Sequence, residues 1–308
     1  MRYLLSALIT TALASAALVA APQSKVPIKV FILAGQSNME GAGKIEGDPS
    51  RNGGKGSLSY LAEHSPNHKH LKGKDGNWIE REDVWISYLD RKGKLAPGFG
   101  ARNSAIGPEL GFGHVIGDAF EEPVLLIKTA WGGKSLAKDF RPPSAGGEVG
   151  PFYREMLERV KSTLSEIAEI FPDLKGRGHE IVGFGWHQGW NDGCAMDMTL
   201  EYEKNLGCFI RDVRKDLGVA KLPFVIADSG FGGEKQKVDR RLKIRAAQAA
   251  PAKLAEFKDN VACVQTAGFF RPPEESPSRQ GYHWNGNAET YYLIGESMAA
   301  AMKKLCGK

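Results

Sequence analysis

The feature that most constrains the fold is a short apolar run that ends in a glycine-bounded serine. The run Ile28-Lys29-Val30-Phe31-Ile32-Leu33-Ala34 is too short for a typical helix, and Gly35 and Ser37 follow it. It predicts a buried strand that delivers Ser37 to a tight turn at its C-terminal end. Ligands of open α/β sheets bind outside the carboxyl ends of the strands, so this hydroxyl is placed as a nucleophile requires. On this segment alone, a plain turn or a helix N-cap explains Ser37 equally well.

The N-terminus has the pattern of an exported protein. Residues 1–21 combine the early charge of Arg2 with an apolar stretch and a small-residue end. This pattern predicts a secretory signal peptide, and therefore a secreted or periplasmic protein. The apolar stretch is short for a membrane span, and Pro22 follows it, so no membrane anchor is expected. Residues 22–308 are long enough for a single α/β domain with a full core.

Charge and cysteine content exclude some classes of protein. The formal net charge of +5 is modest, and Lys and Arg are dispersed among Asp and Glu, so no nucleic-acid partner is expected. The cysteines Cys194, Cys208, Cys263 and Cys306 lack Cys-x-x-Cys spacing, which argues against a zinc site. Disulfide pairing and free buried thiols both stay open, and Cys194 with Cys208 would close the shortest loop.

Residues 41–107 form an irregular region. They are rich in Gly, Asn, His, Lys and Ser and show no sustained periodicity, which is typical of a functional loop system or lid. Residues 84–95 within this long loop insertion predict a hairpin. His64, His68 and His70 have no carboxylate or cysteine at matching spacing, so we expect solvated surface histidines and no metal site.

Strands and helices alternate beyond Gly107. This alternation predicts a three-layer αβα sandwich in which a central parallel sheet of about five strands, the first at residues 28–34, is covered by helices on both faces. The further expected strands are 124–129, 181–186, 224–227 and 261–264, and the expected helices are 108–120, 152–170, 199–217, 238–257 and 287–305.

The same topology brings reactive groups to one edge of the sheet. All strand C-termini of a parallel sheet point the same way, so loops that are distant in sequence can converge there. Acyl transfer by a serine needs an adjacent base, which imidazole supplies, and preorganised donors for the oxyanion. The residues that could fill these roles are Ser37, Gly132, Gly133, Gln188, Asp192 and His283.

Four motifs carry a resemblance to a known superfamily. They are Gly35-Gln36-Ser37-Asn38-Met39-Glu40-Gly41, Lys128-Thr129-Ala130-Trp131-Gly132-Gly133-Lys134-Ser135-Leu136, Trp186-His187-Gln188-Gly189 and Tyr282-His283-Trp284. In this order they resemble the SGNH or GDSL hydrolases, and more narrowly the branch of sialate O-acetylesterases and the acetylxylan esterases of carbohydrate esterase family six. The resemblance implies a flavodoxin-like fold and serine-dependent deacetylation of a carbohydrate, with no metal or organic cofactor.

The resemblance also implies roles for individual residues. Ser37 would be the nucleophile and His283 the base. The oxyanion would be held by the N–H of Ser37, by Gly132 or Gly133, and by Gln188. Aromatic faces suit the apolar side of a pyranose, although core packing explains any single tryptophan as well. The residues expected to contact substrate are Asn38, Trp131, Trp190 and Trp284.

The sequence departs from the family at the acid of the triad. Superfamily members often carry Asp three residues before the histidine, where this chain has Gln280, and related esterases often have Glu where it has Trp190. Asp192 is our first candidate for the acid that orients His283. Glu109, a backbone carbonyl and a serine–histidine dyad are the alternatives.

These observations predict an esterase that removes acetyl groups from a polysaccharide or glycan through an acetyl-serine intermediate. Two alternatives stay open. The first is a non-catalytic glycan-binding module on the same fold, which the missing acids would favour. The second is a general short-chain carboxylesterase, which would not prefer acetyl over longer acyl groups.

Overall fold

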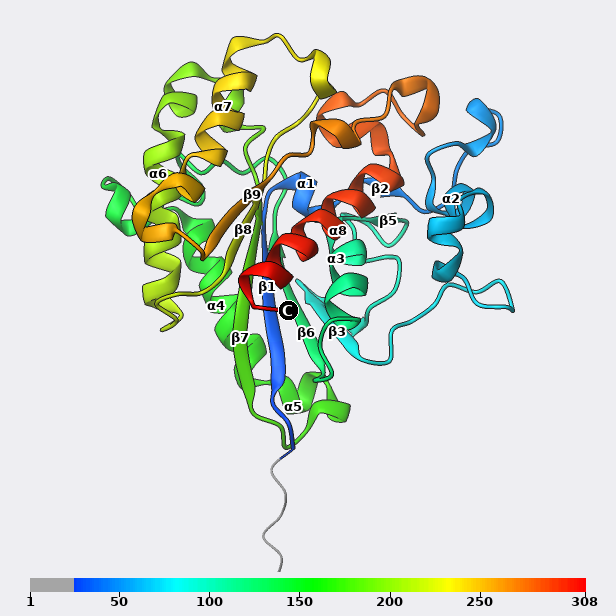
Figure 1. Cartoon of the computed structure of the whole chain (residues 1–308), viewed down its shortest axis with the longest axis horizontal. Helices are drawn as coiled ribbons and strands as arrows, with labels where there is room; N and C mark the ends of the chain where they lie inside the picture. The colour runs from blue at the N-terminus through cyan, green and yellow to red at the C-terminus, as the bar shows by residue number, and fades with distance from the viewer. Residues whose placement is uncertain (1–24) are drawn as a thin grey trace, which may run out of the picture.

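The structure is a computed structural model that describes residues 25–308, so the predicted signal peptide lies outside the described residues. Its central strand is β1 (Ile28–Gly35), which pairs in parallel with β6 (Val124–Ala130) on one side and β7 (His179–His187) on the other (Figure 1). Apart from Lys29, whose side chain is 15% exposed, every residue of β1 is buried. An apolar run buried on both faces is what a central strand of a parallel sheet requires.

The sheet extends on both sides of these strands in the order β4-β3-β6-β1-β7-β8-β9. The parallel strands β8 (Phe224–Ala227) and β9 (Val261–Val264) lie beyond β7. On the other side β3 (Val84–Tyr88) is parallel to β6, and β4 (Arg91–Lys94) is the antiparallel edge strand. The predicted parallel sheet is therefore confirmed, and the hairpin of β3 and β4 extends it beyond the five expected strands.

The order β6-β1-β7-β8-β9 is the flavodoxin-like order 2-1-3-4-5. After β1 the chain passes to one side of this strand, where β6 lies. It later returns to the other side, where β7 lies. A crevice opens at such a switch point, outside the carboxyl ends of the strands. The turn that follows β1 therefore lies where this fold binds ligands.

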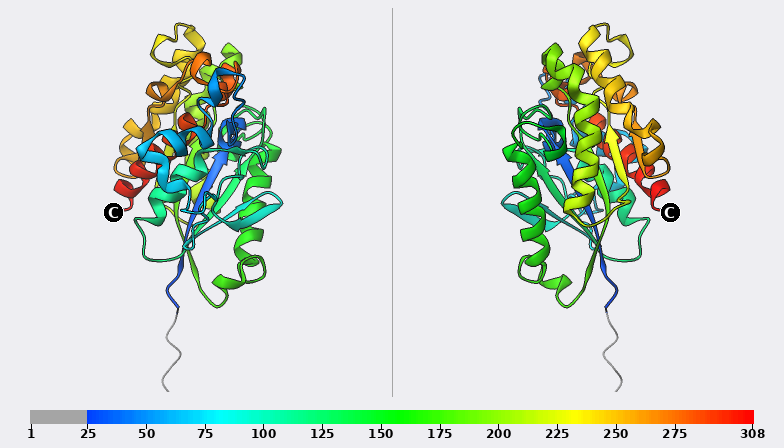
Figure 2. Two further views of the ribbon diagram at one scale, coloured as in Figure 1. Left: turned by 90° about the vertical axis from the view of Figure 1, so that its right-hand side faces the viewer. Right: turned by 90° about the vertical axis from the view of Figure 1, so that its left-hand side faces the viewer.

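Helices cover both faces of the sheet (Figure 2). On one face lie α4 (Pro151–Ser165), α6 (Met196–Asp216) and α7 (Asp239–Ala249), and on the other α3 (Pro108–Gly117) and α8 (Ala288–Leu305). Strand β1 supplies alternate residues to the two hydrophobic cores, as the period of two of a strand requires.

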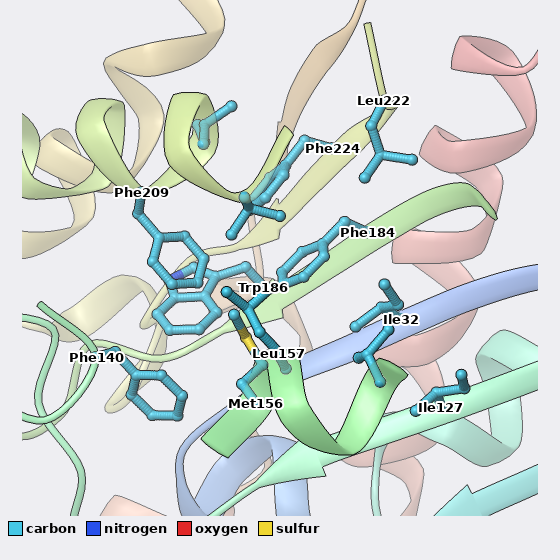
Figure 3. Packing of buried hydrophobic residues seen from close by; sticks show 14 of the residues in the cluster. Ile32, Ile127, Phe140, Met156, Leu157, Phe184, Trp186, Phe209, Leu222 and Phe224 are labelled. Carbon is cyan, nitrogen blue, oxygen red and sulfur yellow. The ribbon is translucent and has the colours of Figure 1, made fainter. Parts of the chain in front are cut away.

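The core under α4 and α6 is rich in aromatic rings (Figure 3). Phe184 stacks on Phe224 with ring centroids 4.7 Å apart, and Trp186 lies 4.5 Å from Phe209. The indole N–H of Trp186 donates to the hydroxyl of Tyr202 over 3.2 Å, so this buried polar atom is satisfied. These rings fix the end of β7 that leads into the loop of Gln188.

The irregular region contains more structure than the sequence predicts. Helix α2 (Leu58–His64) begins at Ser57, whose hydroxyl caps the N–H of Tyr60. The expectation for His68 was wrong: it is buried at 4% exposure, with its ring edge against Tyr292. The remaining short elements are α1 (Ser37–Glu40), β2 (Gly43–Lys44), β5 (Ala105–Ile106) and α5 (Ile167–Ile170).

Helix α7 ends earlier than expected, at Ala249, because Pro251 lacks the N–H that would continue it. The cysteines carry free thiols, of which Cys194 is exposed and Cys208 is buried. Within residues 25–308, no helix is both long and apolar enough to cross a membrane.

Candidate active site

Ser37 lies at the C-terminal end of β1, where the chain turns sharply into α1. The turn depends on Gly35, whose φ is +156° and whose added Cβ would lie 2.2 Å from the carbonyl oxygen of His187. The close approach of β1 to β7 therefore excludes a side chain at position 35. Ser37 itself is partly exposed, in contrast to its buried neighbours Gln36 and Asn38.

Asn38 ties the serine turn to the histidine loop. Its Nδ2 donates to the carbonyl oxygen of Tyr282 over 3.0 Å, and its Oδ1 accepts from the hydroxyl of Tyr291 over 2.8 Å. Tyr282 directly precedes His283, so one buried amide joins the residue after Ser37 to the residue before His283. The amide of Asn38, predicted to contact substrate, is occupied at both ends by these two bonds.

The histidine loop, Gly281–Gly286, has an unusual backbone. Trp284 and Asn285 have φ values of +51° and +56°, and Gly286 continues at +67°. Such conformations are costly for non-glycine residues and cluster at functional sites. Trp284 is fully buried and packs on Phe231 with ring centroids 4.7 Å apart, which holds the loop in place.

Burial lowers the pKa of His283, and no charged neighbour contributes to this shift. The imidazole is therefore neutral at neutral pH, as a general base must be. Among residues 25–308, no carboxylate forms a hydrogen bond to its ring that would orient it.

Asp192 is fully buried and faces the glycine loop. Its carboxylate accepts hydrogen bonds from the backbone N–H groups of Leu136 and Ala137, at 2.9 and 2.8 Å. A third bond, of 2.5 Å, comes from Nε2 of Gln188. Burial outweighs these donors and raises the pKa of Asp192 to about 6. These partners are all in loops that flank Ser37, and none belongs to the histidine loop.

Gln188 lies between three acceptors. Its Nε2 donates to Oε1 of Gln36 at 3.2 Å and to the carbonyl oxygen of Lys134 at 3.0 Å, besides the bond to Asp192. Oε1 of Gln36 also accepts from the N–H of Gly189 over 3.1 Å. The buried amides of Gln36 and Gln188 thus join the loops that follow β1, β6 and β7.

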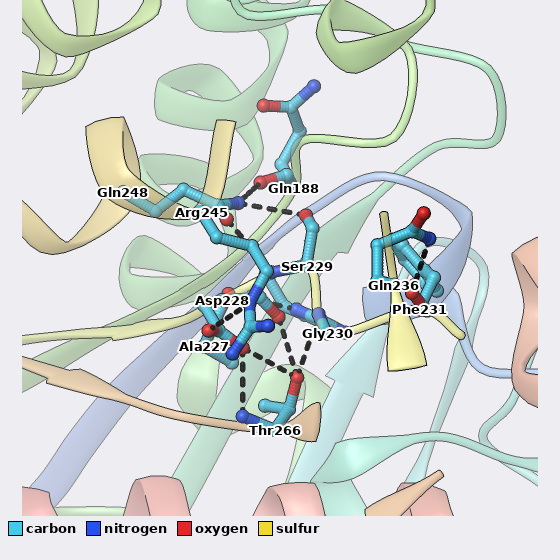
Figure 4. Close-up of polar contacts among 11 residues, drawn as sticks. Gln188, Ala227, Asp228, Ser229, Gly230, Phe231, Gln236, Arg245, Gln248 and Thr266 are labelled. Carbon is cyan, nitrogen blue, oxygen red and sulfur yellow. Dashed lines mark hydrogen bonds and ion pairs between the residues drawn. The ribbon is translucent and has the colours of Figure 1, made fainter. Parts of the chain in front are cut away.

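Gln248 supports the Gln188 loop from the neighbouring helix α7 (Figure 4). Its Nε2 donates to the carbonyl oxygen of Gln188 over 2.6 Å, and its Oε1 accepts from the N–H of Ser229 over 2.8 Å. At Gly189, where φ is +155°, an added Cβ would lie 2.4 Å from Nε2 of Gln248. Sequence reasoning missed Gln248, because a glutamine in an otherwise ordinary helix carries no motif.

Gly132 and Gly133 form an exposed turn beside Ser37. A Cβ added to Gly132 would lie 3.9 Å from Cβ of Ser37, and Gly133 has a φ of +71°. The side chain of Asn191 donates to the carbonyl oxygen of Gly133 and so fixes the turn. The predicted nucleophile and the predicted glycine turn are therefore neighbours.

Glu109 belongs to a buried ion pair. Its Oε2 accepts from Nζ of Lys128 over 2.6 Å, and its Oε1 accepts from the N–H of Gly107 over 2.7 Å. The ammonium group of Lys128 also donates to the carbonyl oxygens of Glu40 and Phe99, each over 2.7 Å. Lys128 thus fixes the C-terminal end of α1. Sequence reasoning missed it, although a lysine inside an apolar strand is a signal of a buried partner.

The aromatic residues differ in exposure. Trp190 is partly exposed and lies 5.6 Å from the ring of Tyr282, which is 41% exposed. Trp131 is also partly exposed and packs on Phe152. Trp284 is a core residue of its loop, so packing is the role that its contacts support. Trp190 and Tyr282 give the site an open aromatic surface next to His283.

A glycine turn lies beside the strand-end Ser37, and Asn38 ties the histidine loop to the same turn, at the carboxyl ends of the strands of a flavodoxin-like sheet. Residues 27–304 match the family described as carbohydrate esterase, sialic acid-specific acetylesterase. The chain belongs to this family and is therefore a carboxylic ester hydrolase of the carbohydrate acetylesterase type.

Individual relatives agree with this assignment. A probable carbohydrate esterase from Arabidopsis thaliana is 27% identical over 248 residues, which are 79% of this chain and 81% of the relative. The X-ray structure of this same Arabidopsis thaliana protein has a TM-score of 0.59 at 19% identity in the structural alignment, which covers 90% of this chain and 98% of that one. A carbohydrate acetylesterase from Xanthomonas citri has a TM-score of 0.57 at 14% identity, with 91% and 57% covered. At these identities the structural likeness shows the fold.

Proposed function

We propose that this chain is a serine-dependent carbohydrate O-acetylesterase that removes acetyl groups from a polysaccharide or glycan outside the cytoplasm. The observation that carries the proposal is the Asn38 bridge, which joins the turn of Ser37 to the loop of His283 beside the exposed turn of Gly132. An enzyme with this arrangement can activate a hydroxyl and stabilise an oxyanion at one point.

The proposed reaction proceeds in two halves. Oγ of Ser37 attacks the acetyl carbonyl carbon while its proton passes to His283, and the tetrahedral intermediate then expels the sugar oxygen, which takes that proton. Water next attacks the acetyl-serine with His283 as base, and acetate leaves as Ser37 regains its proton.

The N–H of Ser37 and that of Gly132 or Gly133 are the proposed oxyanion donors. The N–H of Gly132 also stabilises the carboxylate of Glu40, so its donation to an oxyanion would require that this interaction be exchanged. Gln188 is the fourth candidate. Its Nε2 carries two hydrogens and already faces acceptors on Gln36, Lys134 and Asp192. A donation from Gln188 to the oxyanion therefore requires that one of these bonds be exchanged.

The contacts favour a dyad of Ser37 and His283. Asp192 is engaged by the glycine loop and Glu109 by Lys128, so neither carboxylate is free to orient the imidazole. Orientation is a geometric task that a backbone carbonyl can also perform.

The first test is Ser37→Ala. We expect hydrolysis of an aryl acetate to be abolished while the circular dichroism spectrum stays that of the wild type. Retained turnover would exclude Ser37 as the nucleophile. A fluorophosphonate should label the wild type and not Ser37→Ala, whereas a non-catalytic binding module would show no adduct in either.

Acetate release from acetylated xylan, pectin and sialic acids, compared with longer acyl esters, would separate a carbohydrate acetylesterase from a general carboxylesterase.

The second test is the pH dependence of kcat/KM. Because burial lowers the pKa of His283, the imidazole is neutral over more of the acid range than a free histidine. We expect kcat/KM to rise through one ionisation below pH 6.5 and then to level off, with a tenfold loss per pH unit on the acid side. A rise centred above pH 7 would contradict this assignment.

A further inference from the structure

A carboxylate that the proposed reaction does not use lies beside Ser37. Glu40 is the last residue of α1, the short helix that Ser37 begins. A Cβ added to Gly132 would lie 3.0 Å from Oε2 of Glu40 and 3.9 Å from Cβ of Ser37. Oε2 of Glu40 and the side chain of Ser37 therefore border the same exposed glycine turn.

The carboxylate of Glu40 is held in place. Its Oε1 accepts a hydrogen bond of 3.1 Å from the hydroxyl of Tyr88, a residue that is only 1% exposed. The backbone of Glu40 is fixed by Nζ of Lys128, which donates to its carbonyl oxygen over 2.7 Å. Burial raises the pKa of Glu40, opposed by the Tyr88 hydroxyl, Lys128, the N–H of Gly132 and Arg91. A half-buried acid with one oxygen anchored can present the other to a ligand.

The cations around Glu40 are already engaged. Lys128 is paired with Glu109 at 2.6 Å, so its charge is already balanced. Arg91 donates to the carbonyl oxygens of Gly98 and Gly100, and of the causes that act on the pKa of Glu40 it is the smallest. An anionic group bound beside Ser37 would therefore meet the carboxylate of Glu40, while Lys128 is already paired with Glu109 and Arg91 acts on Glu40 only weakly.

We propose that Glu40 is a specificity residue that selects neutral acetylated glycans, by accepting a hydrogen bond from a sugar hydroxyl near the acetyl group and by repelling a sugar carboxylate there. Hydrogen bonds from hydroxyl groups to an ionised acceptor are short and strong, and like charges brought together in an interface are strongly disfavoured. This inference rests on the proposed function of Ser37.

The experiment compares two probes that are closely matched in shape and differ in charge: the methyl glucuronopyranoside and its neutral C6 carboxamide, each carrying the same single O-acetyl group. We expect the wild type to prefer the neutral probe in kcat/KM by at least about tenfold. Glu40→Gln should bring the ratio close to one, since the charge is gone and the shape is kept. Glu40→Asp keeps the charge and should retain most of the preference. Glu121→Gln is an equal change of charge in the exposed loop before β6, at the N-terminal ends of the parallel strands. It should retain the full preference.

Aryl acetate hydrolysis by the wild type distinguishes a failure of the proposed esterase function from a failure of the proposed role of Glu40. No aryl acetate turnover would overturn the proposed function. Turnover with no preference between the probes, or a preference for the acidic probe, would overturn only the role of Glu40. The role of Glu40 would also be overturned if Glu40→Gln lowered kcat/KM for both probes and for the aryl acetate by one common factor. Glu40 would then act on the turn of Ser37 and not on the sugar.

Discussion

Two buried polar clusters support the turn of Ser37 from opposite sides, and they stabilise a buried charge in different ways. Beneath the end of α1, Lys128 and Glu109 form an ion pair whose side chains are 0% and 1% exposed. On the β7 side, Asp192 is bound by backbone N–H groups and by the amide of Gln188. The first cluster balances charge with charge, and the second balances it with neutral dipoles.

This difference determines how each cluster responds to losing a partner. An ion pair in a low-dielectric site is costly to bury, and removing one member leaves an uncompensated charge. Neutral donors stabilise the charged form of Asp192 less than burial destabilises it, as the raised pKa of about 6 shows. Neutralising Asp192 therefore removes the free-energy cost of burying its charge together with some of its hydrogen bonds. Neutralising Lys128 instead leaves the charge of Glu109 buried without a cation.

The largest expected effect is that of Lys128→Met. It leaves Glu109 buried without a cation and removes the donor to the carbonyl oxygens of Glu40 and Phe99. We expect the free energy of unfolding to fall by about 3–5 kcal/mol in urea denaturation. The double variant with Glu109→Gln should recover part of this loss, since it removes the orphaned charge. If the single variant lost less than about 1 kcal/mol, the pair would not be the charge-balanced cluster described above.

The next effect is a pH dependence that belongs to Asp192 alone. Between its unfolded value near 3.8 and its folded pKa of about 6, the native state keeps a proton that the unfolded chain has released. Unfolded Asp192 thus binds fewer protons over this range, so the free energy of unfolding decreases as pH rises. The contribution is complete below pH 3.8 and is lost as pH passes through about 6, an expected fall of about 3 kcal/mol. Urea denaturation from pH 4 to 8 measures it, and Asp192→Asn should remove this component. A pH dependence that is the same in the variant would exclude Asp192 as its source.

The fold could be predicted from the sequence because strands and helices leave periodic patterns. The strands at 224–227 and 261–264 and the helix that begins after Gly107 lie where the patterns predict them. Of residues 41–107, the hairpin of β3 and β4 could be predicted in this way, and the rest could not. Their short elements, such as α2, are stabilised by contacts with distant segments, among them α8.

The site could be predicted only in part. Ser37, Gly132 and Gln188 follow strands whose carboxyl ends meet, so topology alone brings them together. The partners of Asp192 could not be foreseen, because the closeness of Leu136 and Ala137 depends on how a loop folds back. Glu40 was also missed, since its proximity to Gly132 follows from the side-chain geometry of α1.

The smallest expected change in stability, and the sharpest test of the comparison, is Asp192→Asn at pH 8. The amide offers one oxygen to the donors of Leu136 and Ala137 and turns an NH₂ toward another donor, which costs about 1–3 kcal/mol. Removal of the ionisation penalty offsets this cost, so we expect the free energy of unfolding to change by less than about 1 kcal/mol.

Activity should nonetheless fall in the same variant. Leu136 and Ala137 lie in the loop that carries Gly132, a proposed oxyanion donor, and a small displacement of such a donor is expected to reduce kcat by about tenfold or more. Asp173→Asn, in an exposed segment before β7, is the matched control and should behave as the wild type. A positioning role leaves the pH profile of kcat/KM in place. If Asp192 instead oriented His283 as the acid of a triad, Asp192→Asn would move the acid limb to lower pH, because the imidazolium would lose a negative partner.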